Sequence, residues 1–155
     1  MTIYSKLPKD REQEGTLWVT DEAGATIFGP VRCRGEADNS QAAAHDNPSE
    51  RPTKPYGDHP SGVYQVTSIV DKPQPSRVYG TGYITLLPVS GEALEAYQKG
   101  RRGIAIHGGD LNPQGGLRAT YGCLRADNTT MVTLKRLVSA TWEQGRKAYY
   151  ECVVE

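Results

Sequence analysis

The chain has 155 residues, in which 18 Lys and Arg residues balance 18 Asp and Glu residues to give no formal net charge. A chain of this length folds as one compact domain, and its balanced charge gives no electrostatic basis for binding nucleic acid or an anionic membrane. No stretch reaches the roughly 18 apolar residues of a membrane span, so no integral membrane segment is predicted. Frequent Gly and Pro, with Val, Ile, Thr and Tyr in short runs, predict a mainly β fold.

The chain is predicted to begin with an N-terminal extension at residues 1–15, followed by one domain from residue 16 to 155. Residues 16–20 and 25–29 are rich in β-forming side chains and flank a turn that contains Gly24. This arrangement predicts a hairpin at the start of the domain.

Residues 36–59 contain almost no apolar side chain and are predicted to form a long polar surface loop, either a functional lid or disordered. His45 and His59 lie in this loop and are predicted to be surface residues. Neither belongs to a pattern of metal-ligating residues with the usual spacing, so we expect no metal and no other cofactor.

The remaining elements follow in chain order. Two strands are predicted at 62–70 and 78–89, and a short helix at 92–98 that Gly100 ends. A buried strand at 104–106 and an amphipathic helix at 131–142 come next, with Asp127 or Asn128 as the helix cap. The closing strand is predicted at 148–154, with Tyr149, Cys152 and Val154 directed inward.

Three cysteines cannot all pair within one chain. Cys123 lies in a glycine-containing turn and is predicted to be free, whereas Cys33 and Cys152 are interpreted as buried strand residues rather than as a disulfide.

One histidine and one cysteine form a candidate catalytic pair. His107 ends the apolar run that starts at Gly103, and Cys123 follows in the segment Thr120–Arg125. A thiol becomes a strong nucleophile when a base removes its proton, and an imidazole at a strand end is suited to that role. The helix after Cys123 would place the positive end of its dipole near the thiol. The pair therefore indicates acyl transfer by cysteine.

These segments resemble the L,D-transpeptidase family, also called YkuD, whose signature is H-G followed by S/T-H-G-C and an Ile or Val. His107-Gly108 matches the first part and Thr120-Tyr121-Gly122-Cys123 the second, with Tyr121 where the family usually has a second histidine. Further similarity is seen in the segments Pro60–Tyr64, Gly80–Ile84 and Asn128–Met131. The resemblance extends over residues 16–155 and implies a β-sandwich or barrel of mixed sheets, with one amphipathic helix after the cysteine and a short helix before the histidine strand.

The resemblance also implies roles for individual residues. Cys123 would be the nucleophile and His107 the general base, oriented by a nearby backbone carbonyl such as that of Gly108. Backbone N–H groups of the turn would form an oxyanion hole, and nearby side chains would bind substrate. The oxyanion hole would use Tyr121, Gly122 and Cys123, and the substrate contacts would come from Arg125, Thr120 and Tyr83. For Arg125, a structural salt bridge is the alternative.

The substrate implied is the tetrapeptide stem of peptidoglycan, attacked at the L-centre of diaminopimelate with loss of the terminal D-alanine. The thioester would then pass to a stem amine, a D-amino acid or water, giving cross-linking, exchange or L,D-carboxypeptidase action. One alternative is a peptidoglycan-binding module that lost its catalytic activity through Tyr121. Another is an unrelated cysteine hydrolase in which Asp110 orients the histidine.

The site of action implied is the periplasm or cell envelope, yet the first residues lack the apolar core of a signal peptide. Either a leader has been removed, or a dedicated secretion system exports the protein as an antibacterial effector. In the second case the producing cell would need an immunity protein.

Overall fold

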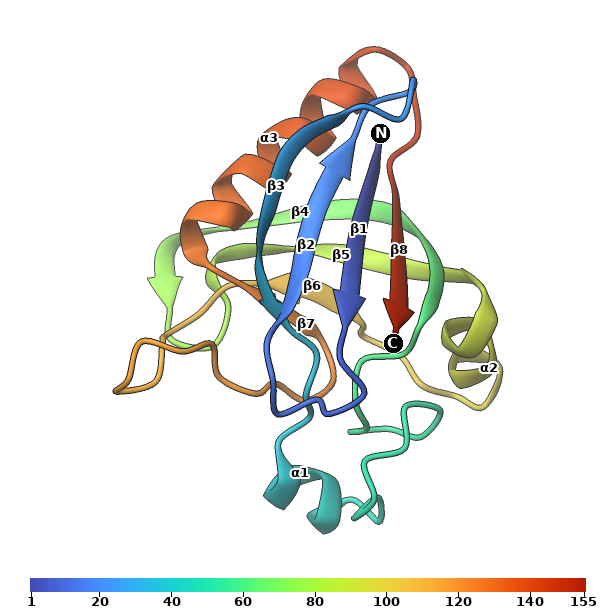
Figure 1. The fold of residues 1–155 in the computed structure, drawn as a ribbon, viewed down its shortest axis with the longest axis vertical. Coiled ribbons are helices and arrows are strands. Elements are labelled where there is room, and N and C mark those ends of the chain that lie inside the picture. Colours follow the sequence, from blue (N-terminus) through green and yellow to red (C-terminus); the bar gives the residue numbers. More distant parts are fainter.

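The computed structural model describes residues 1–155 and has eight strands that close into a barrel in the order β1-β2-β3-β7-β6-β5-β4-β8 (Figure 1). Three helices, α1 (Asn39–Ala44), α2 (Gly91–Gln98) and α3 (Asn128–Glu143), accompany the barrel. The strands are β1 (Thr2–Leu7), β2 (Gly15–Thr20), β3 (Thr26–Arg34), β4 (Gly62–Ser76), β5 (Gly80–Ser90), β6 (Ala105–His107), β7 (Leu124–Ala126) and β8 (Tyr149–Val154). Most neighbouring strands are antiparallel, but β1–β8 and β6–β7 are parallel. The predicted mainly β, mixed-sheet barrel is confirmed.

Strand β1 lies within the barrel, so residues 1–15 are not an extension outside the domain. Ile3 and Leu7 of β1 are buried, and the strand pairs with both β2 and β8. Because β1 is only six residues long, it offers three inward positions, one of which is the polar Ser5. A strand with so few inward residues, one of them polar, gives only a weak alternation of apolar and polar residues in the sequence.

The predicted hairpin at the start of the domain and the two predicted strands that follow the segment 36–59 are confirmed. Strands β2 and β3 pair antiparallel, and the Asp21 carboxylate accepts hydrogen bonds from the N–H groups of Ala23 and Ala25 across the turn. A short polar side chain that bonds to its own turn is the usual reason for Asp at such a position. Strands β4 and β5 form the second, longer antiparallel pair.

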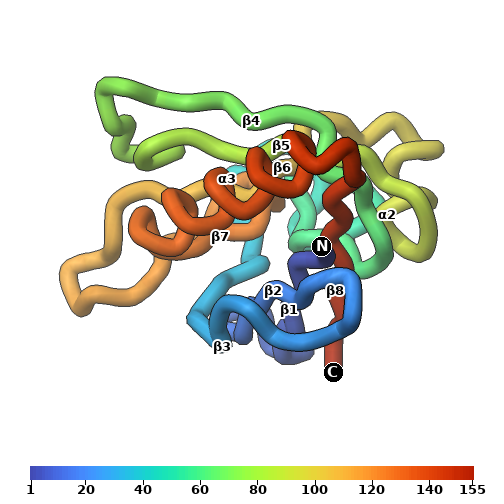
Figure 2. Tube along the Cα trace, turned by 90° about the horizontal axis from the view of Figure 1, so that it is seen from above, coloured from blue at the N-terminus to red at the C-terminus, as the bar shows by residue number.

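Helix α3 fills the space between two parts of the barrel. In Figure 2 it lies between the β4–β5 hairpin and the side formed by β1, β2 and β3. Its buried apolar residues are Met131, Leu134 and Val138, at the predicted helical spacing. Asp127 is the N-cap residue, but its carboxylate makes no capping bond and instead accepts two hydrogen bonds from Arg32 on β3. This pair ties the start of α3 to the barrel wall.

Residues 36–59 are not an unstructured surface loop, because they contain α1 and several buried side chains. The Asn47 side chain donates to the carbonyls of Arg51 and Pro55 and accepts from the Arg51 N–H, which replaces the backbone pairing that a strand would supply. His45 is exposed as predicted, but the prediction for His59 is wrong, since its side chain is completely buried. Its polar ring atoms find partners inside the protein, which is what permits the burial.

Cys33 and Cys152 are buried and free, as predicted. In β8, Tyr150 and Cys152 are the buried residues, whereas Tyr149 and Val154 are half-buried. The predicted inward direction of Tyr149 is therefore wrong. Residues 149 and 152 are an odd number of positions apart, so a regular strand cannot direct both to the same side.

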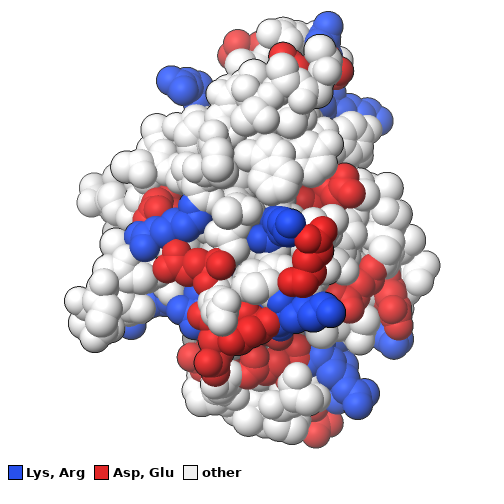
Figure 3. Space-filling model, in the orientation of Figure 1, with Lys and Arg blue, Asp and Glu red and all other residues white.

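Positive and negative side chains lie close together over much of the face in Figure 3, and a group of acidic side chains lies near its lower centre. None of the helices is long and apolar enough to cross a membrane.

Candidate active site

The parallel pair β6–β7 brings His107 and Cys123 to one side of the barrel. Ile106 pairs with Leu124 and His107 with Arg125, and Ile106 and Leu124 are completely buried in the core. Side chains alternate along a strand, so His107 and Arg125 lie on the opposite side of the pair from that core. Cys123 directly precedes β7, two positions before Arg125.

His107 is held in a defined orientation. Its Nδ1 lies 2.7 Å from the carbonyl oxygen of Gly108. A carbonyl only accepts, so Nδ1 carries the hydrogen and the lone pair remains on Nε2. Burial, with a smaller contribution from the charge of Arg125, lowers the pKa of His107 to about 4, although the backbone carbonyls of Gly108 and Val78 act in the opposite direction. The imidazole is therefore neutral at pH 7 and able to accept a proton at Nε2.

Cys123 is partly exposed, and its Sγ lies 3.5 Å from the carbonyl oxygen of Gly103. Burial raises the pKa of the thiol, although the N–H of Ala105 and the charges of Arg101 and Arg125 act in the opposite direction. The thiol makes no hydrogen bond to His107 in this structure. The thiol of Cys123 is therefore protonated at pH 7.

The turn before Cys123 is fixed by Thr120. The Thr120 hydroxyl donates to the Cys123 carbonyl over 2.8 Å and accepts from the Gly122 N–H over 2.9 Å. The hydroxyl and the Gly122 N–H are thus both used within the turn. The Cys123 N–H, by contrast, has no acceptor within the protein.

Arg125 is buried and has no carboxylate partner. One Nη donates to the Gly108 carbonyl over 3.0 Å, whereas the buried Nε has no hydrogen-bond partner. Arg125 shares a hollow of about 160 Å³ with His107, Thr120 and Tyr121. A guanidinium with an unused donor is suited to binding an anionic group.

Tyr79 was not singled out in the sequence, yet it packs its ring against His107. The centroids are 5.0 Å apart and the planes meet at 77°, an edge-to-face contact. Tyr83, in register with His107 on β5, contacts Tyr79, and both tyrosines line a hollow of about 380 Å³. Tyr79 follows β4 by three residues, and no periodic pattern in the sequence relates it to the histidine strand.

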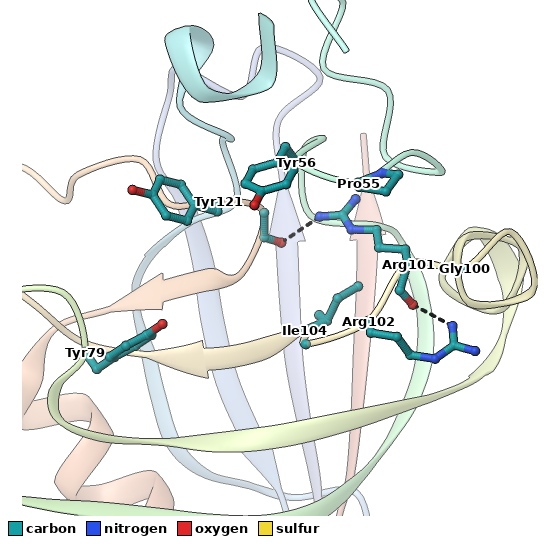
Figure 4. Close-up of a pocket in the computed structure, with 10 residues that line it drawn as sticks. Pro55, Tyr56, Tyr79, Gly100, Arg101, Arg102, Ile104 and Tyr121 are labelled. Carbon is teal, nitrogen blue, oxygen red and sulfur yellow. Dashed lines mark hydrogen bonds between the residues drawn. The ribbon is translucent and has the colours of Figure 1, made fainter. Parts of the chain in front are cut away.

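A second residue that sequence analysis missed is Arg101, which lies beside a hollow of about 270 Å³ (Figure 4). Tyr79 and Tyr121 line this hollow as well as the one containing His107, so the two adjoin. Figure 4 shows the buried Arg101 guanidinium directed at the backbone of the cysteine turn, where one Nη lies 3.4 Å from the Gly122 carbonyl oxygen. Arg101 also donates to the carbonyls of Gly57 and Asp58. It therefore joins the segment 36–59 to the cysteine turn.

Helix α3 supports the histidine rather than the cysteine. The Asn128 side chain at its start accepts a hydrogen bond from the Gly109 N–H over 2.9 Å. Strand β7 separates the helix from Cys123, and the influence of a helix dipole falls off within about one turn. No group of three or more His, Cys, Asp or Glu side chains is placed to hold a metal ion.

The chain is similar to known proteins in sequence and in fold. Residues 29–145 match the family described as the L,D-transpeptidase catalytic domain, YkuD. Bd1075 of Bdellovibrio bacteriovorus has a similar fold, with a TM-score of 0.52 and 14% identity over 86% of this chain and 43% of that chain. An L,D-transpeptidase of Xylanimonas cellulosilytica gives a TM-score of 0.46 and 15% identity over 98% of this chain and 60% of that chain. No curated protein matches the sequence.

This chain therefore spans less than two thirds of the length of either solved structure. The family match nevertheless covers most of the chain and includes the segments of both His107 and Cys123. The protein belongs to the L,D-transpeptidase catalytic domain family, YkuD, whose members act on peptidoglycan in the cell envelope.

Proposed function

We propose that the protein is a cysteine acyltransferase that acts on tetrapeptide stems of peptidoglycan through a Cys123 thioester. The observation that carries this proposal is the orientation of the His107 ring. Its Nδ1–H is bound to the Gly108 carbonyl, which leaves the Nε2 lone pair as a base on the side of the barrel where Cys123 lies. General-base activation is the step that a protonated thiol requires.

In the first half-reaction, His107 Nε2 accepts the thiol proton and Sγ forms a bond to the carbonyl carbon at the L-centre of diaminopimelate. The carbonyl oxygen becomes an oxyanion, and the Cys123 N–H is a donor that is not used elsewhere. The C–N bond to the terminal D-alanine then breaks, and the imidazolium returns its proton to the leaving amine. A thioester and free D-alanine result.

In the second half-reaction, the thioester carbonyl is attacked by a stem amine, a D-amino acid or water. His107 accepts the proton of the attacking group, the bond to Sγ breaks, and the imidazolium gives its proton to the thiolate, which restores the thiol and the neutral histidine. Arg125 is proposed to bind a substrate carboxylate in the hollow that it lines, with Tyr83 and Tyr121 as further substrate contacts.

Mass spectrometry of tetrapeptide muropeptides, with and without an added D-amino acid, tests this function. The wild type is expected to yield tripeptides, 3-3 dimers or exchanged stems, and Cys123→Ala none of these. His107→Gln serves as the matched variant that keeps the thiol but removes the base. Tetrapeptides left intact by the wild type would overturn the proposal.

A peptidoglycan-binding module is the second candidate, favoured by the raised thiol pKa and the missing His107–Cys123 hydrogen bond. Such a module would bind tetrapeptide muropeptides without releasing D-alanine. Calorimetric titration of the Cys123→Ala variant with the same muropeptides, beside the activity measurement, distinguishes a binder from an enzyme.

The same chemistry would damage a foreign envelope if the protein were exported as an antibacterial effector. Periplasmic expression in a Gram-negative host is then expected to cause lysis or shape defects, and Cys123→Ala is expected to be harmless. Growth equal to that of the Cys123→Ala strain would count against the effector role.

A further inference from the structure

His59 is completely buried directly behind the cysteine turn, although it belongs to the polar segment 36–59. Its ring lies 5.7 Å from that of Tyr64 and 5.6 Å from that of Tyr150, measured between centroids. Its backbone N–H donates to the Gly35 carbonyl, which fixes the main chain at this point. The two tyrosine rings and the backbone hydrogen bond therefore restrict the position of the His59 ring independently of its ring nitrogens.

Both ring nitrogens have partners. Nδ1 lies 3.0 Å from the carbonyl oxygen of Gly122, the residue before the cysteine, and Nε2 lies 3.0 Å from the Tyr150 hydroxyl. The Tyr150 hydroxyl in turn lies 2.6 Å from the Ser5 hydroxyl on β1. A continuous chain of hydrogen bonds thus runs from the barrel strands to the cysteine turn.

The direction of every bond in this chain follows from the carbonyl at its end. The Gly122 oxygen only accepts, so Nδ1 carries the hydrogen. In a neutral imidazole Nε2 is then the acceptor, which makes Tyr150 the donor to His59 and Ser5 the donor to Tyr150. Burial and the charges of Arg101 and Arg11 lower the pKa of His59 to about 3, so the ring is neutral at pH 7.

We propose that His59 is a positioning residue that sets the orientation of the Gly122–Cys123 peptide, and with it the Cys123 N–H that faces the developing oxyanion. This inference rests on the proposed function. A trans peptide is planar, so its N–H points away from the side to which its carbonyl points. By binding the Gly122 carbonyl from within the core, His59 directs the Cys123 N–H away from the core.

The turn needs such support because glycine leaves its backbone free to adopt other conformations. Gly122 has φ of +113°, a region that side-chain-bearing residues rarely adopt. Two groups bind its carbonyl, but the Arg101 contact of 3.4 Å is longer than that of His59 at 3.0 Å. Because hydrogen bonds weaken with distance, His59 is the main partner of this carbonyl, whereas Thr120 holds the Gly122 N–H and the Cys123 carbonyl.

Two substitutions of His59 distinguish the contribution of Nδ1 from that of Nε2. An Asn side chain can present its amide near the position of Nδ1, whereas a Gln amide extends towards that of Nε2. We expect His59→Gln to lower kcat for D-alanine release about 10- to 100-fold with little change in KM, since small displacements of an oxyanion donor are costly. His59→Asn is expected to keep kcat within about threefold of the wild type by the same reasoning.

Tyr150→Phe is the matched control for stability. It removes the hydroxyl from the buried chain but leaves Nδ1 bound to the Gly122 carbonyl. Its Tm is expected to fall as much as that of His59→Gln, with kcat nearly unchanged. Equal kcat for His59→Gln and His59→Asn, or a kcat loss in Tyr150→Phe that matches its loss of Tm, would mean that His59 only stabilises the fold.

The Cys123 amide resonance gives a readout that does not depend on turnover. Its chemical shift is expected to change in His59→Gln and to stay close to the wild-type value in His59→Asn. An unchanged shift in His59→Gln would overturn the positioning role. Absence of D-alanine release by the wild type would instead contradict the proposed function, so the two failures are distinguishable.

Discussion

Tyr79 lies edge-to-face against His107, with ring centroids 5.0 Å apart. Edge-to-face contacts stabilise the paired rings by about 0.5–1.5 kcal/mol. If His107 becomes mobile when this contact is lost, the same free energy corresponds to a decrease in rate of up to about 10-fold. Tyr79→Ala is therefore expected to lower kcat by up to about 10-fold, and Tyr79→Phe to leave it unchanged. Steady-state release of D-alanine measures both, and a fully active Tyr79→Ala would contradict the role given to this ring.

The acid limb of the pH–rate profile is expected near pH 4. His107 has a pKa lowered to about 4 and must be neutral to accept the thiol proton, so kcat/KM falls only when the pH approaches that value. Activity should stay level from about pH 5 to pH 8 because both members of the pair keep their protonation states. Circular dichroism at each pH controls for unfolding. An acid limb at pH 6 or above would show that His107 is not held as described.

Alkylation of Cys123 by iodoacetamide is expected to accelerate about tenfold per pH unit between pH 7 and pH 9, because burial raises the thiol pKa above its ordinary value. Cys33 and Cys152 are buried, so Cys123→Ser should show almost no alkylation and serves as the control. A rate that reaches its plateau below pH 7.5 would instead indicate a stable thiolate–imidazolium pair.

Gly122→Ala is expected to destabilise the protein far more than Gly115→Ala. Both glycines have positive φ, but a Cβ at Gly122 would lie 1.9 Å from an Arg101 nitrogen and 2.5 Å from the Gly57 carbonyl oxygen. A Cβ at Gly115 meets nothing within 4 Å. Urea unfolding should therefore give a loss of about 1 kcal/mol for Gly115→Ala and at least about 3 kcal/mol for Gly122→Ala. Equal losses would contradict the close packing of Arg101 on the turn.

Stability is expected to fall as the pH drops from 7 to 5. His59 and His107 have folded-state pKa values lowered to about 3 and about 4, so over this range the unfolded chain binds protons that the folded chain does not. Each histidine then contributes a loss of about 2 kcal/mol between pH 7 and pH 5. Urea unfolding at both pH values measures the loss, and His59→Gln should show a smaller pH dependence. The same loss in that variant would show that His59 is not buried as a neutral ring.

The sequence alone determined those features that depend on residues near one another in the chain. Short-range patterns of apolar residues and glycine predict the β2–β3 hairpin, strands β4 and β5, helices α2 and α3, and the strand that ends at His107. These patterns are readable because the repeat of buried positions differs between helices and strands. The residues around His107 and Cys123 also resemble the signature of the family, and the match over residues 29–145 confirms the family.

Tertiary structure alone decided which distant residues support the candidate site. In the sequence, Tyr79 lies far from His107, and both His59 and Arg101 lie far from Cys123. Each is a polar or aromatic residue in a segment that has no clear periodic pattern of apolar residues. A buried polar side chain is stable only when its partners are present, and the partner of His59 is a backbone carbonyl 63 positions away. Closure of the barrel brings that carbonyl within reach, which is why the sequence suggested an exposed histidine and the fold contains a buried one.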